Sequence, residues 1–179
     1  MKNKINRRTF IKTSSAVGSA AAILPNTLLS SSEKKTVKIG FIGTGLRGQW
    51  MLWLAAKYPD VEIPAICDID ESMISSGLKI LKDGGKIKPR VYSKHDEDYL
   101  NMLENEDLDG VYIATPWEWH HPMAIAAMKS GKHVGTEVPA ALTVNECWDL
   151  VNTSEQTGKL CMIMENVCYR RDIMAILNM

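Results

Sequence analysis

The sequence predicts an α/β fold, a doubly wound parallel sheet with helices on both faces. Three observations carry this prediction: apolar runs alternate with helical patterns after a polar linker, the first run ends in the motif G-x-G-x-x-G, and an acid follows the second run. Strands that alternate with helices form a parallel sheet, because each helix returns the chain to the starting edge. Ligands of such folds bind at the carboxyl ends of the strands.

The glycine motif predicts a turn that receives a pyrophosphate. Gly43 allows a tight turn, Gly45 lets the backbone approach the phosphates, and Gly48 lets the following helix pack closely. Asp68 stands twenty residues after Gly48. A carboxylate there accepts hydrogen bonds from the adenosine ribose and repels the 2′-phosphate of NADP, so we expect NAD. The alternative is a plain βαβ unit with a glycine-rich turn.

Six strands alternate with five helices in the expected order. The strands are expected at Val37–Ile42, Glu62–Cys67, Arg90–Tyr92, Gly110–Thr115, His133–Gly135 and Leu160–Met164. The helices are expected at Leu46–Lys57, Glu71–Leu81, Asp96–Asn101, Pro122–Ser130 and Thr143–Thr157, with Gly131 and Gly158 as stop signals. This order places the residues that follow the fourth, fifth and sixth strands at one edge of the sheet, near the nucleotide.

The expected loop after the fourth strand is dense in aromatic and titratable residues. Trp117 and Trp119 offer flat apolar surface for a nicotinamide or a sugar, and His120 offers an acid, a base or a hydrogen-bond donor. Alternatively, the tryptophans belong to the core and the histidines cap the next helix. We expect no metal at His120 and His121, because sequence neighbours seldom point the same way and a third ligand is missing.

Polar residues also follow the last two strands. Glu137 could bond a hydroxyl of the nicotinamide ribose or take part in proton transfer, or it could be a solvated turn residue. Asn166 could bind the carboxamide or ribose, and Tyr169 could meet the substrate, or both could simply start a helix. The candidate catalytic residues are therefore His120, Glu137 and Tyr169.

The bulk composition restricts the partners. The chain has 45% hydrophobic residues, enough for a sizeable core, and 21 basic against 21 acidic residues give zero formal charge. A neutral chain lacks the basic footprint of a nucleic-acid-binding protein, so no nucleic acid is expected. The four cysteines show no C-x-x-C spacing, and we expect buried free thiols that bind no metal.

The N-terminus predicts a twin-arginine (Tat) export signal with its linker at residues 1–32. Arg7 and Arg8 precede Phe10 and Lys12, and an uncharged stretch of small and apolar residues follows at 16–29. An amphipathic helix is the alternative. The stretch is too short to span a membrane comfortably, so we expect no integral span after removal of the leader. The expected location is the periplasm or another exported compartment.

Together, these motifs resemble the Gfo/Idh/MocA oxidoreductase family. Its members usually carry Glu-Lys-Pro after the fifth strand, whereas this chain has Val138 in place of the lysine that handles protons in alcohol–ketone interconversion. The strings Trp117-Glu118-Trp119-His120 and Glu137-Val138-Pro139-Ala140-Ala141 resemble one branch, glycoside hydrolase family 109, the NAD-dependent α-N-acetylgalactosaminidases. The resemblance implies NAD contacts, in addition to the glycine motif, at Leu46, Arg47, Asp68, Trp117, Glu118, Trp119, His120, Glu137, Val138 and Asn166.

The resemblance also implies an activity on a small-molecule glycoside. Hydride leaves the sugar C3 for NAD, elimination expels the aglycone, water adds at C1, and the hydride returns to C3. The expected domains are a Rossmann domain at 33–166 and the start of a truncated substrate domain at 167–179. Truncation would leave the chain inactive alone and favour a homo-oligomer through exposed apolar surface. The alternatives are an NAD-dependent sugar dehydrogenase and a nucleotide-binding fragment without catalysis.

Overall fold

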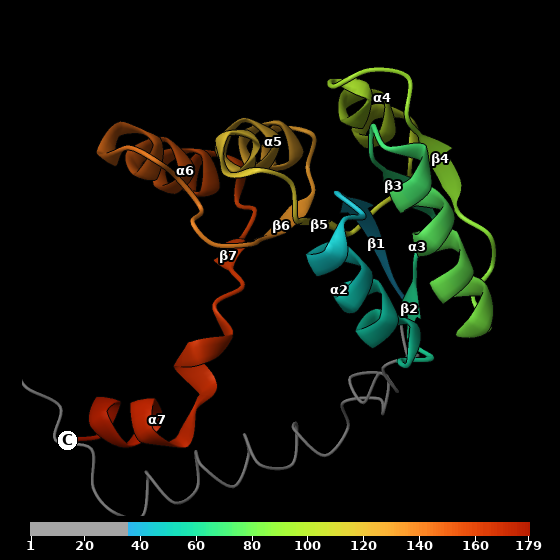
Figure 1. The fold of residues 1–179 in the computed structure, drawn as a ribbon. Coiled ribbons are helices and arrows are strands. Elements are labelled where there is room, and N and C mark those ends of the chain that lie inside the picture. The colour runs from blue at the N-terminus through green and yellow to red at the C-terminus, as the bar shows by residue number, and fades with distance from the viewer. Residues whose placement is uncertain (1–35) are drawn as a thin grey trace, which may run out of the picture. The chain divides into compact units, whose positions relative to one another are not determined.

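A computed structural model describes residues 36–179, so the predicted leader and linker at 1–32 lie outside the described residues. A parallel sheet with helices on both faces confirms the predicted fold class (Figure 1). The strands are β1 (Val37–Ile42), β2 (Val61–Glu62), β3 (Ala65–Cys67), β4 (Arg90–Tyr92), β5 (Gly110–Ile113), β6 (His133–Thr136) and β7 (Cys161–Ile163). The helices are α2 (Leu46–Ala56), α3 (Glu71–Asp83), α4 (Asp98–Asn105), α5 (Trp117–Lys129), α6 (Val144–Thr157), the 3-10 helix η2 (Asn166–Tyr169) and α7 (Arg171–Leu177).

The strand order creates a crevice for a ligand. The sheet runs β4-β3-β1-β5-β6-β7, with β2 paired to β1, and all its ladders are parallel. The chain moves outward from β1 in one direction through β3 and β4, and then in the other direction from β5. The loops that follow β1 and β5 therefore diverge, and ligands of doubly wound sheets bind at such a switch point.

The second predicted strand is divided into two. Val61 and Glu62 pair with the start of β1, whereas Ala65–Cys67 pair with its end and with β4. Pro64 lies between the two pieces and has no N–H to donate to a ladder, which interrupts the strand. Its carbonyl accepts a hydrogen bond from the N–H of Arg90. The sheet therefore has seven strands where six were predicted.

Two helices begin two or more residues away from the predicted start. The helix predicted at Pro122 begins at Trp117, so the residues expected to form a loop occupy the first turns of α5. Pro122 in the sixth position lacks only the bond to the carbonyl four residues earlier, and the helix continues through it. The helix predicted at Asp96 begins at Asp98, because the Asp98 carboxylate accepts the N–H of Lys94 and closes a turn first.

The core lies on both faces of the sheet, and neighbouring strand residues alternate between the faces as the period of a strand requires. Phe41, Ile66 and Tyr112 belong to the cluster that α2 and α3 cover. Their neighbours Ile42, Cys67 and Ile113 belong to the cluster under α4, α5 and α6. All six of these side chains are buried.

The end of the described chain is far less buried than the sheet. The helices η2 and α7 bury no residue, and Met162 and Ile163 of the edge strand β7 are about half exposed, at 48% and 52%. The four cysteines are free as predicted, but only Cys67 is fully buried, and Cys147 and Cys168 are exposed because they lie on solvent-facing helical positions. No helix within residues 36–179 is long and apolar enough to cross a membrane.

Candidate functional site at the carboxyl edge of the sheet

The glycine motif forms the turn between β1 and α2. Gly43 has a φ of 89°, a conformation that favours glycine, and a Cβ there would lie 2.6 Å from the backbone of Ala114. A Cβ on Gly48 would lie 2.1 Å from the carbonyl oxygen of Gly43, so α2 could not pack on the turn with any side chain. By contrast, no atom of the described residues 36–179 lies within 4 Å of a Cβ on Gly45, which leaves space for a ligand beside the backbone.

Asp68 is bonded directly to this turn. Its Oδ2 accepts hydrogen bonds from the N–H of Thr44 at 2.5 Å and from the Thr44 hydroxyl at 3.0 Å, and its Oδ1 accepts the N–H of Asp70 at 3.0 Å. Thr44 is completely buried. Each carboxylate oxygen can accept about two hydrogen bonds, so Oδ1 retains capacity for a ligand.

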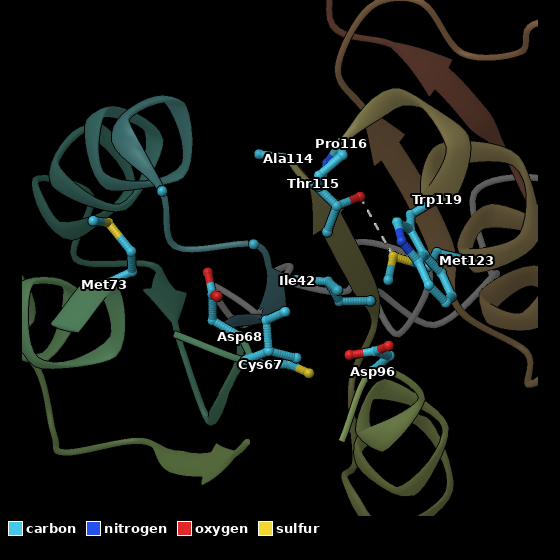
Figure 2. A pocket seen from close by; sticks show the side chains of 13 residues that line it. Ile42, Cys67, Asp68, Met73, Asp96, Ala114, Thr115, Pro116, Trp119 and Met123 are labelled. Carbon is cyan, nitrogen blue, oxygen red and sulfur yellow. Dashed lines mark hydrogen bonds between the residues drawn. The ribbon is translucent and has the colours of Figure 1, made fainter. Parts of the chain in front are cut away.

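A cleft of about 330 Å³ opens beside the turn and Asp68, and Figure 2 shows the side chains that line it. Its floor and walls are mostly apolar, with the two acids Asp68 and Asp96 on its lining. The apolar side comprises Ile42, Cys67, Ile69, Met73, Ala114, Pro116, Trp119 and Met123. Apolar walls with a few polar groups are typical of cofactor sites.

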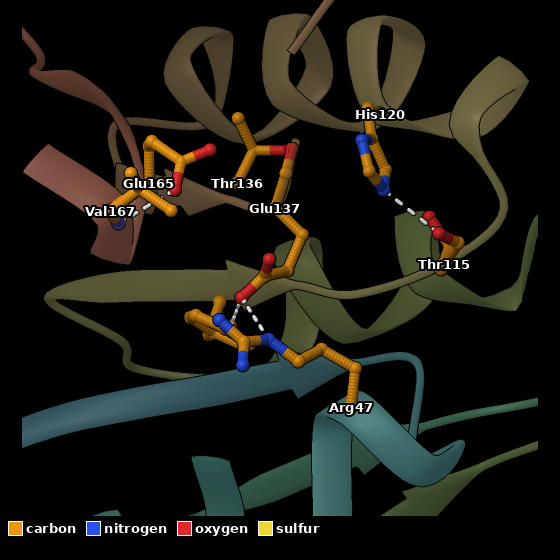
Figure 3. A network of polar contacts seen from close by, with 8 residues as sticks. Arg47, Thr115, His120, Thr136, Glu137, Glu165 and Val167 are labelled. Carbon is orange, nitrogen blue, oxygen red and sulfur yellow. Dashed lines mark hydrogen bonds and ion pairs between the residues drawn. The ribbon is translucent and has the colours of Figure 1, made fainter. Parts of the chain in front are cut away.

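A second group of polar side chains joins α2 to the loop after β6. Arg47 Nε donates to Glu137 Oε1 at 2.7 Å, and the Tyr112 hydroxyl donates to the same oxygen. The pair is drawn in Figure 3. Glu137 is only 8% exposed, so these two donors stabilise a carboxylate that has little contact with water. The other carboxylate oxygen of Glu137, Oε2, accepts no hydrogen bond from residues 36–179 and can accept one from a ligand.

The pKa values of the two donors reflect this arrangement. The hydrogen bond to Glu137 raises the pKa of Arg47, so its guanidinium stays charged. Burial, together with the bond to Glu137, raises the pKa of Tyr112, so its phenol stays protonated as a donor. Burial also raises the pKa of Cys67 in the cleft floor to about 12. This thiol is therefore neutral at physiological pH and unsuited to nucleophilic chemistry.

His120 holds two loops together. Its ring is 1% exposed, with Nδ1 2.7 Å from the carbonyl oxygen of Pro139 and Nε2 2.8 Å from that of Thr115. Figure 3 shows the contact with Thr115. The loops that follow β5 and β6 are thus tied to the first turns of α5. Main-chain carbonyl oxygens lie within hydrogen-bond distance of both ring nitrogens, so the ring keeps the two loops in position, and its predicted catalytic role stays a prediction.

The structure brings together some of the predicted site residues and separates others. Gly43, Gly45, Asp68 and Trp119 share the cleft, and Arg47 contacts Glu137. Apart from the buried His120, the remaining side chains predicted at the site are exposed and do not line the cleft. These are Leu46, Trp117, Glu118, Val138, Asn166 and Tyr169.

Sequence reasoning missed three residues of this edge. Thr44 lies between two glycines of the motif, and its small polar side chain could have been expected to face the acid after the next strand. Tyr112 lies inside an apolar strand, where the position of its hydroxyl depends on a loop 25 residues later. Asp96 was assigned to a helix, although it lies in the turn before α4 and lines the cleft. Residues 36–179 contain no group of three or more His, Cys, Asp or Glu side chains that could hold a metal ion.

Comparisons with known proteins agree with this geometry. Residues 37–165 match the family model of the Gfo/Idh/MocA oxidoreductases, described as an oxidoreductase family with an NAD-binding Rossmann fold. Two curated relatives are named glycosyl hydrolase family 109 proteins. The one from Shewanella pealeana is 45% identical over 98% of this chain and 42% of its own length. The one from Parabacteroides distasonis is 47% identical over 97% of this chain and 41% of its own length.

The chain thus spans about two fifths of the length of these relatives. Among solved structures, the WlbA dehydrogenase from Chromobacterium violaceum, crystallised with NADH and UDP-GlcNAcA, has a TM-score of 0.68. It is 20% identical, and the likeness covers 81% of this chain and 39% of that one. This likeness supports the same fold for the matched part of this chain.

Proposed function

Because this chain belongs to the Gfo/Idh/MocA oxidoreductase family and carries its NAD-binding Rossmann domain, we propose that it is the NAD-binding part of an NAD-dependent glycoside hydrolase of family 109. The observation that carries the proposal is the 45–47% identity to proteins of that name over nearly the whole chain. The substrate we propose is an α-N-acetylgalactosaminide. A sugar dehydrogenase is the second candidate, favoured by the family's oxidoreductase description.

The residues at the edge of the sheet fit NAD. Gly45 leaves space beside the backbone where a pyrophosphate could approach, and the N-terminal N–H groups of α2 follow immediately. Asp68 retains acceptor capacity at Oδ1 for a ribose hydroxyl, and its charge opposes the 2′-phosphate of NADP. Glu137 retains Oε2 for a second hydroxyl. Bound NAD would supply reversible hydride transfer to and from the sugar, so that hydrolysis proceeds without net oxidation.

The residues near the cleft would then act by binding and orientation. Arg47 and Tyr112 hold the Glu137 carboxylate in one place. Its Oε2 can therefore accept a hydrogen bond from a hydroxyl without a rearrangement of the side chain. Val138 directly follows Glu137 and is 39% exposed. It stands at the position where the family usually has a lysine. An apolar side chain cannot accept or donate the proton of an alcohol–ketone interconversion, so in either activity another residue must move the proton of the sugar hydroxyl.

The N-terminal motif is compatible with this function, and we propose export by the twin-arginine route. That route carries folded proteins, so the cofactor could be loaded before export. A cofactor regenerated in each cycle requires no pool of NAD outside the cytoplasm. Retention of NAD through export can be tested by measuring nucleotide released on heating from protein purified from the periplasm.

The experiment that tests the function compares this chain with the Parabacteroides distasonis relative on an aryl α-N-acetylgalactosaminide. Aryl release and absorbance of NADH are followed together. We expect the relative to release the aryl group without accumulating NADH, and this chain to retain NAD, detected by mass spectrometry near one per chain. Accumulation of NADH in proportion to sugar consumed would support the dehydrogenase and overturn the hydrolase.

A further inference from the structure

The cleft has a second acid that the proposed function does not use. Asp96 lines the cleft with Asp68, and Figure 2 shows both side chains. Asp68 already accepts three hydrogen bonds from the protein. Asp96 is exposed and has no hydrogen bond or ion pair with any residue of 36–179, so its carboxylate is available to a ligand.

The strand order places Asp96 relative to the parts of NAD. The glycine turn follows β1, Asp68 follows β3, and Asp96 follows β4, and these strands are consecutive neighbours in the order β4-β3-β1. A dinucleotide with its pyrophosphate at the glycine turn and its adenosine ribose at Asp68 can place its base in the same cleft. Asp96 is the second acid on the lining of that cleft.

The apolar walls of the cleft suit a flat base. Trp119, Met123 and Ile69 line the cleft, and the side chain of Ile69 is 64% exposed. Apolar and aromatic surfaces commonly hold the faces of a base and leave its edge to polar groups. The edge of adenine carries an N6 amino group that donates hydrogen bonds, and a carboxylate only accepts them.

We propose that Asp96 accepts a hydrogen bond from the N6 amino group of the NAD adenine, and thereby selects adenine over bases that carry a carbonyl oxygen there. This inference rests on the NAD-binding domain and is independent of the glycosidase activity. A charge-assisted hydrogen bond has a strength that corresponds to about tenfold in affinity. A dinucleotide whose base has a carbonyl oxygen in place of the N6 amino group loses that bond and places the oxygen against the carboxylate of Asp96. Such a dinucleotide should therefore bind at least about tenfold more weakly than NAD.

The test measures the affinity of the 179-residue chain for NAD, for nicotinamide hypoxanthine dinucleotide and for NADP by calorimetry. The hypoxanthine analogue has a carbonyl oxygen in place of the N6 amino group and is otherwise the same molecule. The variants are Asp96→Ala and, as a matched control, Glu97→Gln, which removes one negative charge from the neighbouring exposed residue that does not line the cleft.

We expect the unaltered chain and Glu97→Gln to prefer NAD over the analogue by about tenfold, and Asp96→Ala to bind both within about twofold of each other. The preference for NAD over NADP should be unchanged in Asp96→Ala. A preference that survives in Asp96→Ala, or no preference in the unaltered chain, overturns the proposal. A gain of NADP binding in Asp96→Ala also overturns it, because the acid would then face the ribose. Failure of the unaltered chain to bind NAD would instead overturn the assignment of the cofactor to the chain itself.

Discussion

Arg47 and Glu137 form an ion pair with 2.7 Å between Nε and Oε1, although 90 residues separate them in the chain. The first lies in the opening turn of α2, inside the glycine motif, and the second follows β6. The pair therefore links two motifs that sequence analysis treats separately, across the switch point of the sheet.

Replacement Glu137→Gln should weaken NAD binding more than it weakens the fold. The side chain of Arg47 is 38% exposed, so its guanidinium can be hydrated when its partner loses the charge, and the free energy of unfolding should fall by only about 1 kcal/mol. Calorimetry with NAD should show an affinity loss of about tenfold or more. Glu165→Gln is the control, since its carboxylate accepts only the N–H of Val167. Equal affinities for NAD in both variants would contradict a role for Glu137 in binding.

Tyr112→Phe should lower the free energy of unfolding by about 1–2 kcal/mol, because the buried carboxylate loses one of its two donors. Urea denaturation followed by tryptophan fluorescence measures this change. The matched control is Tyr99→Phe, since Tyr99 is equally buried at 5% and its hydroxyl has no hydrogen bond with residues 36–179. The expectation fails if the two variants are equally stable.

Gly45→Ala and Gly48→Ala should have opposite effects on fold and binding. A Cβ on Gly48 meets a carbonyl oxygen at 2.1 Å, so we expect a loss of stability above the usual overpacking cost of about 1–3 kcal/mol. A Cβ on Gly45 has open space, so the fold should tolerate it while NAD binding is lost. Thermal unfolding and calorimetry separate the two effects. NAD binding that survives in Gly45→Ala would show that the pyrophosphate lies elsewhere.

His120→Ala should reduce the free energy of unfolding by about 2–4 kcal/mol, because it leaves a buried cavity and removes the ring from two carbonyl oxygens. Urea denaturation provides the measurement. His121→Ala is the control, since the ring of His121 lies 3.6 Å from Asp149 and has no hydrogen bond within the described residues. Full stability of His120→Ala together with lost hydrolysis by the intact enzyme would indicate a chemical role.

Cys67 should resist thiol reagents in the native protein. Burial raises its pKa to about 12, so at pH 8 roughly one thiol in ten thousand is a thiolate. Cys67→Ser should leave the number of thiols that react with a disulfide reagent under native conditions unchanged, and lower the number in denaturant from the four of the sequence to three. Loss of a fast-reacting native thiol would contradict this expectation.

The same pKa predicts how Cys67 affects stability at alkaline pH. The folded state favours the neutral thiol, so this contribution is complete below the unfolded pKa of about 8.5 and is lost as the pH rises toward 12. The unfolding free energy of Cys67→Ala should therefore depend less on pH between 9 and 11 than that of the unaltered chain. Identical slopes would contradict the shift.

Local signals in the sequence were sufficient for the fold class and the glycine turn. Alternating apolar runs specify parallel strands, and the spacing of Gly43, Gly45 and Gly48 specifies the backbone that the structure has. Helix starts were less predictable. Pro122 was read as a helix start, but its position in α5 depends on the packing of the preceding turn around His120.

Contacts between distant residues were beyond the reach of sequence reasoning. Glu137 was weighed as a solvated turn residue, and it is buried only because Tyr112 and Arg47 supply donors from other elements. Tyr169 and Asn166 lie on η2, which buries no residue, and no contact there tests their predicted roles. Those roles stay predictions. A single sequence carries no signal for which pairs meet across a sheet.

The two hydrogen bonds from Thr44 to Asp68 constrain any redesign of cofactor preference. A change from NAD to NADP normally begins by removing the acid. Here that acid also accepts hydrogen bonds from the N–H and the hydroxyl of Thr44, a fully buried residue in the turn. Replacing Asp68 with an apolar side chain would leave both donors of Thr44 without an acceptor. An engineer who wishes to admit the extra phosphate must therefore rebuild the turn and the acid together.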